Sequence, residues 1–123
     1  MDRRCLVVLT LTPGLLWTTL ARAAPPQSVQ AEVDFLLASI EASGCAFNRN
    51  GTWHDSKAAM THLRDKYDYL VARDLIVTTE DFIERAATKS SLSGQPYEVR
   101  CGGGAAVTSS RWLNDKLGHL RAP

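Results

Sequence analysis

The sequence predicts an α+β domain in which a small three-stranded antiparallel sheet packs against helices, with the element order α-β-β-α-α-β-α. Four stretches carry apolar residues at helical spacing, each with a capping signal at one end. Two short runs flank an Asn-Gly pair, and a third run alternates just before a glycine-rich loop. One cysteine begins the first of these runs and another ends the third, so a disulfide would set how the strands pair.

The first 23 residues have the pattern of a cleavable secretory signal peptide, so they are left out of the fold prediction. Two arginines precede an apolar run over residues 6–20, and Ala21-Arg22-Ala23 fits a small-x-small cleavage site. A Pro-Gly pair interrupts the run, which is also too short for a transmembrane helix. The start of the chain resembles a twin-arginine signal as well, so the export route, general secretory or twin-arginine, stays open.

Cleavage after Ala23 leaves residues 24–123, a chain of 100 residues that is expected to form one disulfide-linked domain. The signal peptide holds three of the 14 basic and one of the 13 acidic residues, so the mature chain has 11 basic and 12 acidic residues. Without a net positive charge, nucleic acid and anionic membrane surfaces are poor partners. No later stretch is apolar for long enough to span a bilayer.

The mature chain is expected to begin with an amphipathic helix and a hairpin. Gly44 stands where a helix C-terminal cap belongs, and Asn50-Gly51 between two short runs is typical of a type I′ turn. The apolar face of the helix comprises Val29, Val33, Leu36, Leu37 and Ile40, and the hairpin pairs Arg49 with Thr52, Asn48 with Trp53 and Phe47 with His54.

Two helices, a strand and a last helix follow. Asp55 is a good N-cap for the first helix, Thr78 to Asp81 have a capping-box pattern for the second, and Ser109 or Ser110 caps the last. The strand lies where alternate residues from 97 to 101 are apolar. The apolar helix positions are Ala59, Leu63, Tyr67 and Leu70, then Phe82, Ile83, Ala86 and Ala87, then Leu113, Leu117 and Leu120.

Cys45 and Cys101 are the two cysteines left after cleavage, and an even count in a small exported chain predicts a disulfide. Because a bridge needs Cα atoms about 5.5 Å apart, the first and third strands run antiparallel. The sheet order is then 2-1-3, and both cysteines lie on the face that the helices cover. The expected pairs are Phe47 with Val99 and Arg49 with Tyr97.

Two runs are more specific than any helix pattern: Cys-Ala-Phe-Asn-Arg-Asn-Gly at residues 45–51 and Ser-Gly-Gln-Pro-Tyr at residues 93–97. With the stretches around them, they resemble the YfeK-like family of small exported bacterial proteins, which has a domain of unknown function. The resemblance covers nearly the whole mature chain. It implies a periplasmic location in a Gram-negative bacterium, and it implies no activity.

The serine-rich stretch SSLSGQPY, residues 90–97, is where an active site would first be sought. A small hydrolase acting on envelope material would use Ser91 or Ser93 with a histidine, but the chain lacks the Gly-x-Ser-x-Gly of a nucleophile elbow. The favoured interpretation is a turn, in which the serines hydrogen-bond the helix end and Gly94 reverses the chain. No residue is therefore assigned a catalytic role.

Metal and cofactor motifs are not visible in the sequence. His54 and His62 are eight residues apart on different expected elements, and neither Cys-x-x-Cys nor His-Glu-x-x-His occurs. The glycines at 102–104 have no lysine after them, so they do not form a phosphate-binding loop. We expect no metal and no cofactor.

A binding surface is expected at one rim of the sheet and on its open face. Arg49, Tyr97 and the amide of Gln95 form a polar rim, and Trp53 points away from the helices as an exposed aromatic side chain of the kind that anchors partners. Alternatively, the N-terminal tail of the mature chain or the glycine-rich loop covers Trp53. The expected function is a non-catalytic periplasmic binding or interaction module whose partner, an envelope protein or a small ligand, is unknown.

The first prediction is that the mature protein begins at Ala24, because Ala21-Arg22-Ala23 is the one well-placed cleavage triplet. The intact mass of protein purified from the periplasm should match residues 24–123. Recovery of the full-length chain from the cytoplasm would contradict the assignment.

Overall fold

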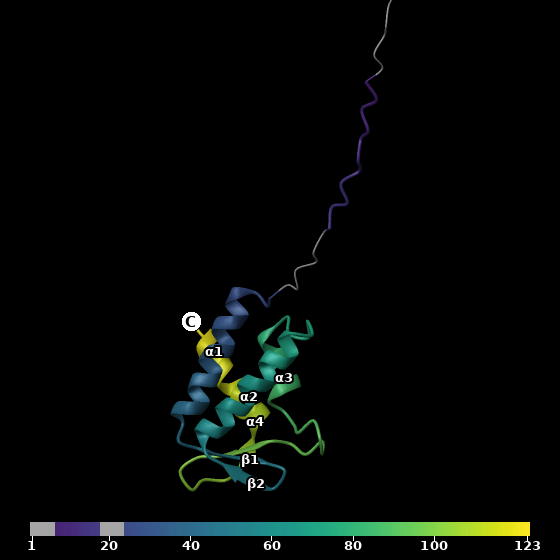
Figure 1. Cartoon of the computed structure of the whole chain (residues 1–123). Helices are drawn as coiled ribbons and strands as arrows, with labels where there is room; N and C mark the ends of the chain where they lie inside the picture. The colour runs from purple at the N-terminus through teal and green to yellow at the C-terminus, as the bar shows by residue number, and fades with distance from the viewer. Residues whose placement is uncertain (1–6, 18–23) are drawn as a thin grey trace, which may run out of the picture.

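The structure is a computed structural model that describes residues 7–17 and 24–123. The basic start of the expected signal peptide and its cleavage triplet fall outside the described residues. Residues 7–17 form no helix or strand, and their large apolar side chains are exposed. In Figure 1 this segment runs away from the folded domain. Within the described ranges, no helix has both the length and the apolar character needed to cross a membrane.

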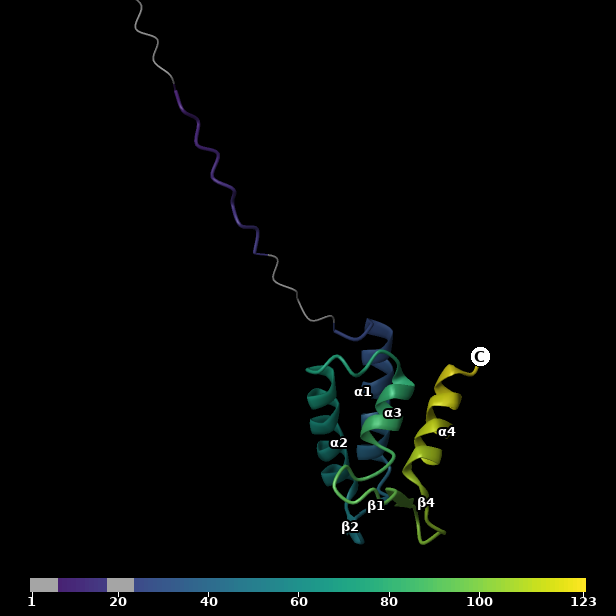
Figure 2. The same cartoon turned by 90° about the vertical axis from the view of Figure 1, so that its right-hand side faces the viewer.

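The domain consists of helices whose ends rest on a small sheet, which lies across one end of the helices (Figures 1 and 2). This arrangement confirms the α+β class. The helices are α1 (Gln27–Ala42), α2 (Ser56–Val71), α3 (Thr79–Ala86) and α4 (Ser109–Arg121), and the strands are β1 (Ala46–Arg49), β2 (Thr52–His54), β3 (Glu98–Arg100) and β4 (Val107–Thr108).

The sheet has four strands in the order β2-β1-β3-β4, so the prediction of three strands is wrong. The missed strand, β4, pairs antiparallel with β3 and places Val107 opposite Val99. Two residues are too few to show the alternation by which a strand is recognised. The same residues correct the start of α4, because Thr108, and neither Ser109 nor Ser110, is the N-cap and accepts a hydrogen bond from the Arg111 N–H.

The hairpin has the predicted register. All three pairs between β1 and β2 form as expected. Asn50 and Gly51 have φ values of 54° and 82°, which is the left-handed backbone that a type I′ turn requires. The turn residues therefore set which side chains of the two strands face the helices.

The pairing of β1 with β3 is confirmed at Phe47 and Val99 but ends before the predicted pair of Arg49 with Tyr97. Tyr97 lies outside β3. Its N–H donates to the Thr88 carbonyl at 3.0 Å, and its carbonyl accepts from the Ser109 N–H at 2.8 Å. These two bonds hold Tyr97 between the end of α3 and the start of α4, so it is not a residue of the sheet rim.

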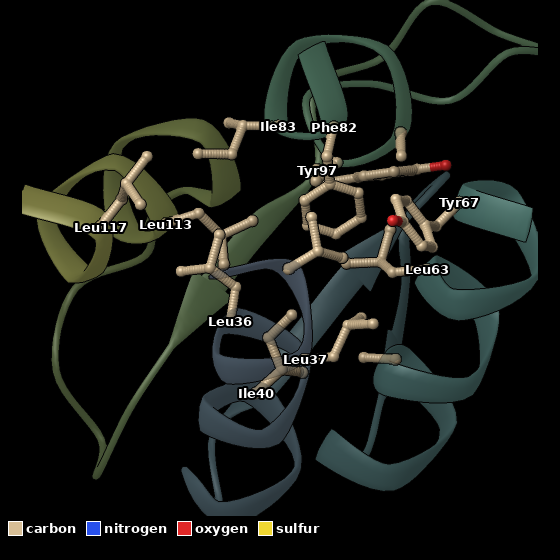
Figure 3. Close-up of a cluster of buried hydrophobic side chains, with 14 of the residues drawn as sticks. Leu36, Leu37, Ile40, Leu63, Tyr67, Phe82, Ile83, Tyr97, Leu113 and Leu117 are labelled. Atoms are coloured by element: carbon tan, nitrogen blue, oxygen red, sulfur yellow. The ribbon is translucent and has the colours of Figure 1, made fainter. Parts of the chain in front are cut away.

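The core is built where the helices meet the sheet. Figure 3 shows labelled side chains from all four helices converging with Tyr97. The rings of Tyr67 and Phe82 meet edge to face, with centroids 5.6 Å apart. Leu120, which was predicted to lie on the same apolar face, does not join this core and is 40% exposed. The buried helix residues with the largest side chains are Leu36, Leu37, Ile40, Leu63, Tyr67, Phe82, Ile83, Leu113 and Leu117.

The helix caps at the turns are those that the sequence predicts. The Asp55 side chain accepts from the Ala58 N–H, and Thr78 and Asp81 form a reciprocal capping box. Gly44 has a φ of 63°, the left-handed conformation that ends α1 just before β1.

An ion cluster ties α4 to α1 and α3. The Arg121 guanidinium binds both carboxylate oxygens of Glu32, at 2.7 and 2.9 Å, and also contacts Glu80. The buried Thr79 hydroxyl donates to Glu32 at 2.7 Å. The hydrogen bonds from Arg121 and Thr79 lower the pKa of Glu32 to about 2, so this carboxylate is ionised at any ordinary pH.

A disulfide joins Cys45 to Cys101, with Cα atoms 4.4 Å apart. It connects the residue before β1 to the residue after β3, which are neighbours in the sheet. Cys45 is buried as predicted, but Cys101 is exposed because β3 ends at Arg100 and the chain turns outward. The bridge therefore joins the ends of the two central strands of the sheet.

We expect that a Cys45→Ser/Cys101→Ser variant loses roughly 4 kcal/mol of stability against urea, because the bridge restricts a long loop in the unfolded chain. Because both cysteines of the mature chain are replaced, the double variant contains no unpaired thiol. Dithiothreitol should lower the stability of the natural mature protein by a similar amount and should leave the double variant unchanged. Equal stabilities of the two proteins without reductant would show that the bridge is not structural.

Candidate functional site

The serine-rich stretch forms a hydrogen-bonded turn. The Ser90 side chain is buried, and its hydroxyl accepts from the N–H groups of Leu92 and Ser93 at 3.2 and 3.3 Å. The Gly94 N–H donates to the Ser90 carbonyl at 2.9 Å, and Gly94 has a φ of 71°. This geometry is that of a helix-to-strand turn, which needs a glycine at the left-handed position.

Neither candidate nucleophile is hydrogen-bonded to a histidine within the described residues. The Ser93 hydroxyl donates to the Asn50 side chain and accepts from the Gln95 N–H at 3.2 Å, so it links this turn to the hairpin turn. Ser91 is exposed and shares a shallow depression with His62. The Nε2 atom of His62, however, is hydrogen-bonded to the Tyr97 hydroxyl.

Trp53 is half-buried, so its side chain is not exposed as expected, and a group other than the predicted tail or glycine-rich loop covers it. The guanidinium carbon of Arg100 lies 4.2 Å from the centroid of the Trp53 ring. Arg100 belongs to β3, so its side chain reaches across β1 to stack on a ring of β2. This covering group was not among the alternatives that the sequence suggested.

A small hollow lies between the hairpin and α2, and we call it the hairpin–α2 hollow. Its volume is about 80 Å³. It brings together Arg49 and Tyr97 of the predicted surface, while Trp53 and Gln95 are not among its lining residues. The lining residues are Phe47, Asn48, Arg49, His54, Ala58, Ala59, His62, Leu63, Tyr97 and Ser109.

The Tyr97 hydroxyl is the hydrogen-bonding centre beside this hollow. It lies 3.2 Å from Lys66 Nζ and 3.2 Å from His62 Nε2. An ammonium group can only donate, so the Tyr97 oxygen accepts from Lys66. The Tyr97 proton is then available to His62 Nε2, which accepts it as a neutral imidazole protonated at Nδ1. The Lys66 ammonium also donates to the Lys89 carbonyl at 3.3 Å.

The electrostatic environment disfavours further positive charge at this centre. The pKa of His62 is lowered to about 4, mainly by burial and in part by the charges of Arg49 and Lys66, against a smaller opposing effect of Asp65. Burial and Arg49 also lower the pKa of Lys66. Burial raises the pKa of the Tyr97 hydroxyl. His62 is therefore neutral and Tyr97 protonated at neutral pH, in agreement with the hydrogen-bond roles derived above.

Arg49 is the charged group of the hollow without a counter-ion. The residue is half-buried, and its guanidinium makes no hydrogen bond or ion pair with the described residues. Arginine stays charged at every physiological pH and offers donors in a planar fork. An unpaired, partly desolvated guanidinium is a group that a ligand oxygen can satisfy.

The sequence analysis missed Lys66 and assigned no role to His62. Both lie on α2 at a spacing of four, beside the apolar positions Leu63 and Tyr67. This spacing puts them on one side of the helix, at the border of its buried face. The spacing therefore indicated that His62 and Lys66 are neighbours on the helix surface, but nothing in the sequence places Tyr97 next to them. Across residues 7–17 and 24–123, no three His, Cys, Asp or Glu side chains are grouped so that they could hold a metal ion.

Comparison with known proteins finds a family but no assigned activity. The profile of a family of unknown function, DUF5329, matches residues 27–121, which run from the start of α1 to the end of α4. The uncharacterized protein YfeK of Salmonella typhimurium (strain LT2) is 34% identical over 85 residues, which cover 68% of this chain and 69% of that protein. No solved structure gives a significant match.

We expect His62 to titrate near pH 4 in the folded protein, measured by NMR of its imidazole carbons and protons. This value lies below the 6.5 of an unperturbed histidine, so neutral His62 stabilises the fold at pH 6.5 and above. That stability should be lost as the pH falls from 6.5 through 4, because in this range the unfolded chain binds a proton at this histidine that the folded protein does not yet bind.

Arg49→Gln should raise the pKa of His62, because it removes a positive charge that disfavours protonation. Arg111→Gln on α4 removes the same charge from an exposed position and should leave the His62 titration unchanged. A His62 midpoint near 6.5 in the natural protein would contradict the buried, hydrogen-bonded arrangement.

Proposed function

The chain belongs to a family of unknown function (DUF5329), and we propose that it is an exported periplasmic protein whose role is non-catalytic binding, with the hairpin–α2 hollow as its binding site. The observation that carries this proposal is the unpaired Arg49 guanidinium at a hollow lined by Tyr97 and His62. A concave site with a few convergent polar groups and shifted pKa values is the usual setting of a ligand.

Three features support export to the periplasm of a Gram-negative bacterium. The first 23 residues have the composition of a signal peptide. The family match begins at residue 27, just beyond the expected cleavage site. Disulfides such as Cys45–Cys101 form and persist in oxidising compartments, and the bacterial periplasm is one of these.

The hydrogen bonds of the serine-rich turn support a non-catalytic role. Ser90 and Ser93 satisfy backbone groups of their own turn, as turn serines do elsewhere. A general base must reach the hydroxyl proton that it takes, and the Nε2 atom of His62 is directed at Tyr97.

The alternative is a small envelope hydrolase that uses Ser91 or Ser93 with a histidine. One observation favours it: Ser91 and His62 line the same depression next to the hollow. For catalysis, His62 would have to exchange its hydrogen bond with Tyr97 for one with Ser91.

The proposal is tested with the mature protein in two arms. In the first, a chemically diverse set of small fragments is titrated while backbone ¹H–¹⁵N NMR signals are followed. The shifts should concentrate at residues 47–49 and 58–63, which line the hollow. Binding that concentrates around Trp53 would place the site on the other surface and contradict the proposal.

In the second arm, a fluorophosphonate probe that labels activated serines is added to the folded protein. We expect no stoichiometric labelling, because the Ser93 hydroxyl serves the turn and the Ser91 hydroxyl is hydrogen-bonded to no histidine of the described residues. Ser91→Ala and Ser93→Ala are the matched controls, and each should cost about 1 kcal/mol of stability or less. Labelling that one of these two substitutions abolishes would replace the binding module with the hydrolase.

A further inference from the structure

The hairpin–α2 hollow concentrates positive charge in a chain whose total charge is nearly balanced. Its lining includes Arg49 and two imidazoles, and none of its lining residues is acidic. Lys66 does not line the hollow, but its ammonium group lies beside it, because it donates a hydrogen bond to the Tyr97 hydroxyl. The acidic residue that influences His62 is Asp65, whose effect is smaller than those of Arg49 and Lys66.

The two charged groups, Arg49 and Lys66, repel each other, and neither forms an ion pair with a described residue. The charge of Arg49 disfavours protonation of both His62 and Lys66. Folded proteins usually pair a partly buried charge, because desolvation without a partner is unfavourable. By contrast, Arg64 pairs with Asp34 at 3.2 Å, and Arg121 pairs with two glutamates. Arg49 is thus a charged group whose natural partner is not supplied by the described residues.

We propose that the hairpin–α2 hollow binds an oxyanion, a carboxylate or phosphate group, with Arg49 as its principal partner. The inference rests on the proposed function and names the ligand class of that same site. The guanidinium fork matches the paired oxygens of either group. His54 and His62 line the same hollow and add imidazole nitrogens that donate when protonated.

The lining also limits what is attached to the oxyanion. Phe47, Ala59 and Leu63 contribute an apolar floor, which fits a short aliphatic or aromatic stem. A volume of about 80 Å³ admits one such group and its first few atoms. The ligand is therefore the anionic end of a small molecule, or of a chain that extends out of the hollow.

Anion binding in this place is coupled to protonation. A bound negative charge favours the protonated form of a nearby imidazole, opposing the effects of Arg49 and Lys66 on His62. The other charged or titratable neighbours acting on His62 are Asp65, which raises its pKa, and His54, which lowers it. A bound oxyanion should therefore raise the His62 midpoint.

The test uses the mature protein and four probes in ¹H–¹⁵N NMR titrations: inorganic phosphate, acetate, the neutral isostere acetamide, and sodium chloride at matched ionic strength. Phosphate, acetate or both should shift the signals of Arg49, His54 and His62 and raise the His62 midpoint. Acetamide and chloride should do neither. A stronger response to phosphate or to acetate identifies which of the two oxyanions the site prefers.

Arg49→Gln should weaken binding of the responding anion about tenfold or more, because a charge-assisted pair is lost. Arg49→Lys keeps the charge without the fork and should bind with intermediate affinity. Arg111→Gln is the matched control and should bind as the natural protein does. Thermal unfolding confirms that each variant is folded before it is titrated.

Two results would overturn the oxyanion inference. Acetamide that shifts the same signals as acetate would show a hollow that binds without selecting charge, which leaves the proposed function standing. Anions that leave the lining signals unchanged, or that bind Arg49→Gln as well as the natural protein, would remove Arg49 as the anion partner. In that case the fragment titration decides separately whether the hollow binds anything.

Discussion

The position of Tyr97 depends on two backbone hydrogen bonds, and the candidate site depends on that position. Its N–H is held by Thr88 at the end of α3, and its carbonyl is held by Ser109 at the start of α4. With the backbone fixed at both groups, the buried ring projects toward α2, where its hydroxyl meets His62 and Lys66. One residue thus connects the last two helices, the sheet and the wall of the hollow. The serine-rich turn and the disulfide act on either side of it, since the turn precedes Tyr97 and the bridge follows β3.

The candidate site contains a hydrogen-bonded centre, the Tyr97 hydroxyl, and a charged group that no described residue pairs with, the Arg49 guanidinium. The Tyr97 hydroxyl uses its lone pair and its proton, so this centre is satisfied within the protein and can be partly buried without penalty. Arg49 lines the same hollow without such partners among the described residues. Burial and the charges of Arg49 and Lys66 keep His62 neutral, whereas an arginine stays charged at every physiological pH. Tyr97 is thus a positioning group, and Arg49 is the group that is available to bind a ligand.

Trp53 has the predicted orientation but not the predicted exposure, for a reason that lies in the sheet. Alternation along β2 correctly places Trp53 opposite Asn48, away from His54 and Phe47. The sequence does not show that Arg100, two strands away, would cover the indole. Contacts between strands that are distant in sequence depend on register and on side-chain reach across the intervening strand, and neither is encoded locally. The same limitation hid the approach of Tyr97 to α2.

The sequence alone determined the features that depend on neighbouring residues. Helical periodicity, the Asp55 and Thr78 caps and the Asn50-Gly51 turn follow from residue type and spacing. The antiparallel pairing of Phe47 with Val99 is a long-range feature that the sequence revealed through its pair of cysteines. Tertiary structure decided what depends on distant segments. It added the two-residue strand β4, which exists because β3 offers it an edge, and it moved Tyr97 out of the ladder into contact with α2. It also assembled the hollow from β1, β2, α2 and the residues before β3 and at the start of α4, whose proximity comes from packing around a shared core.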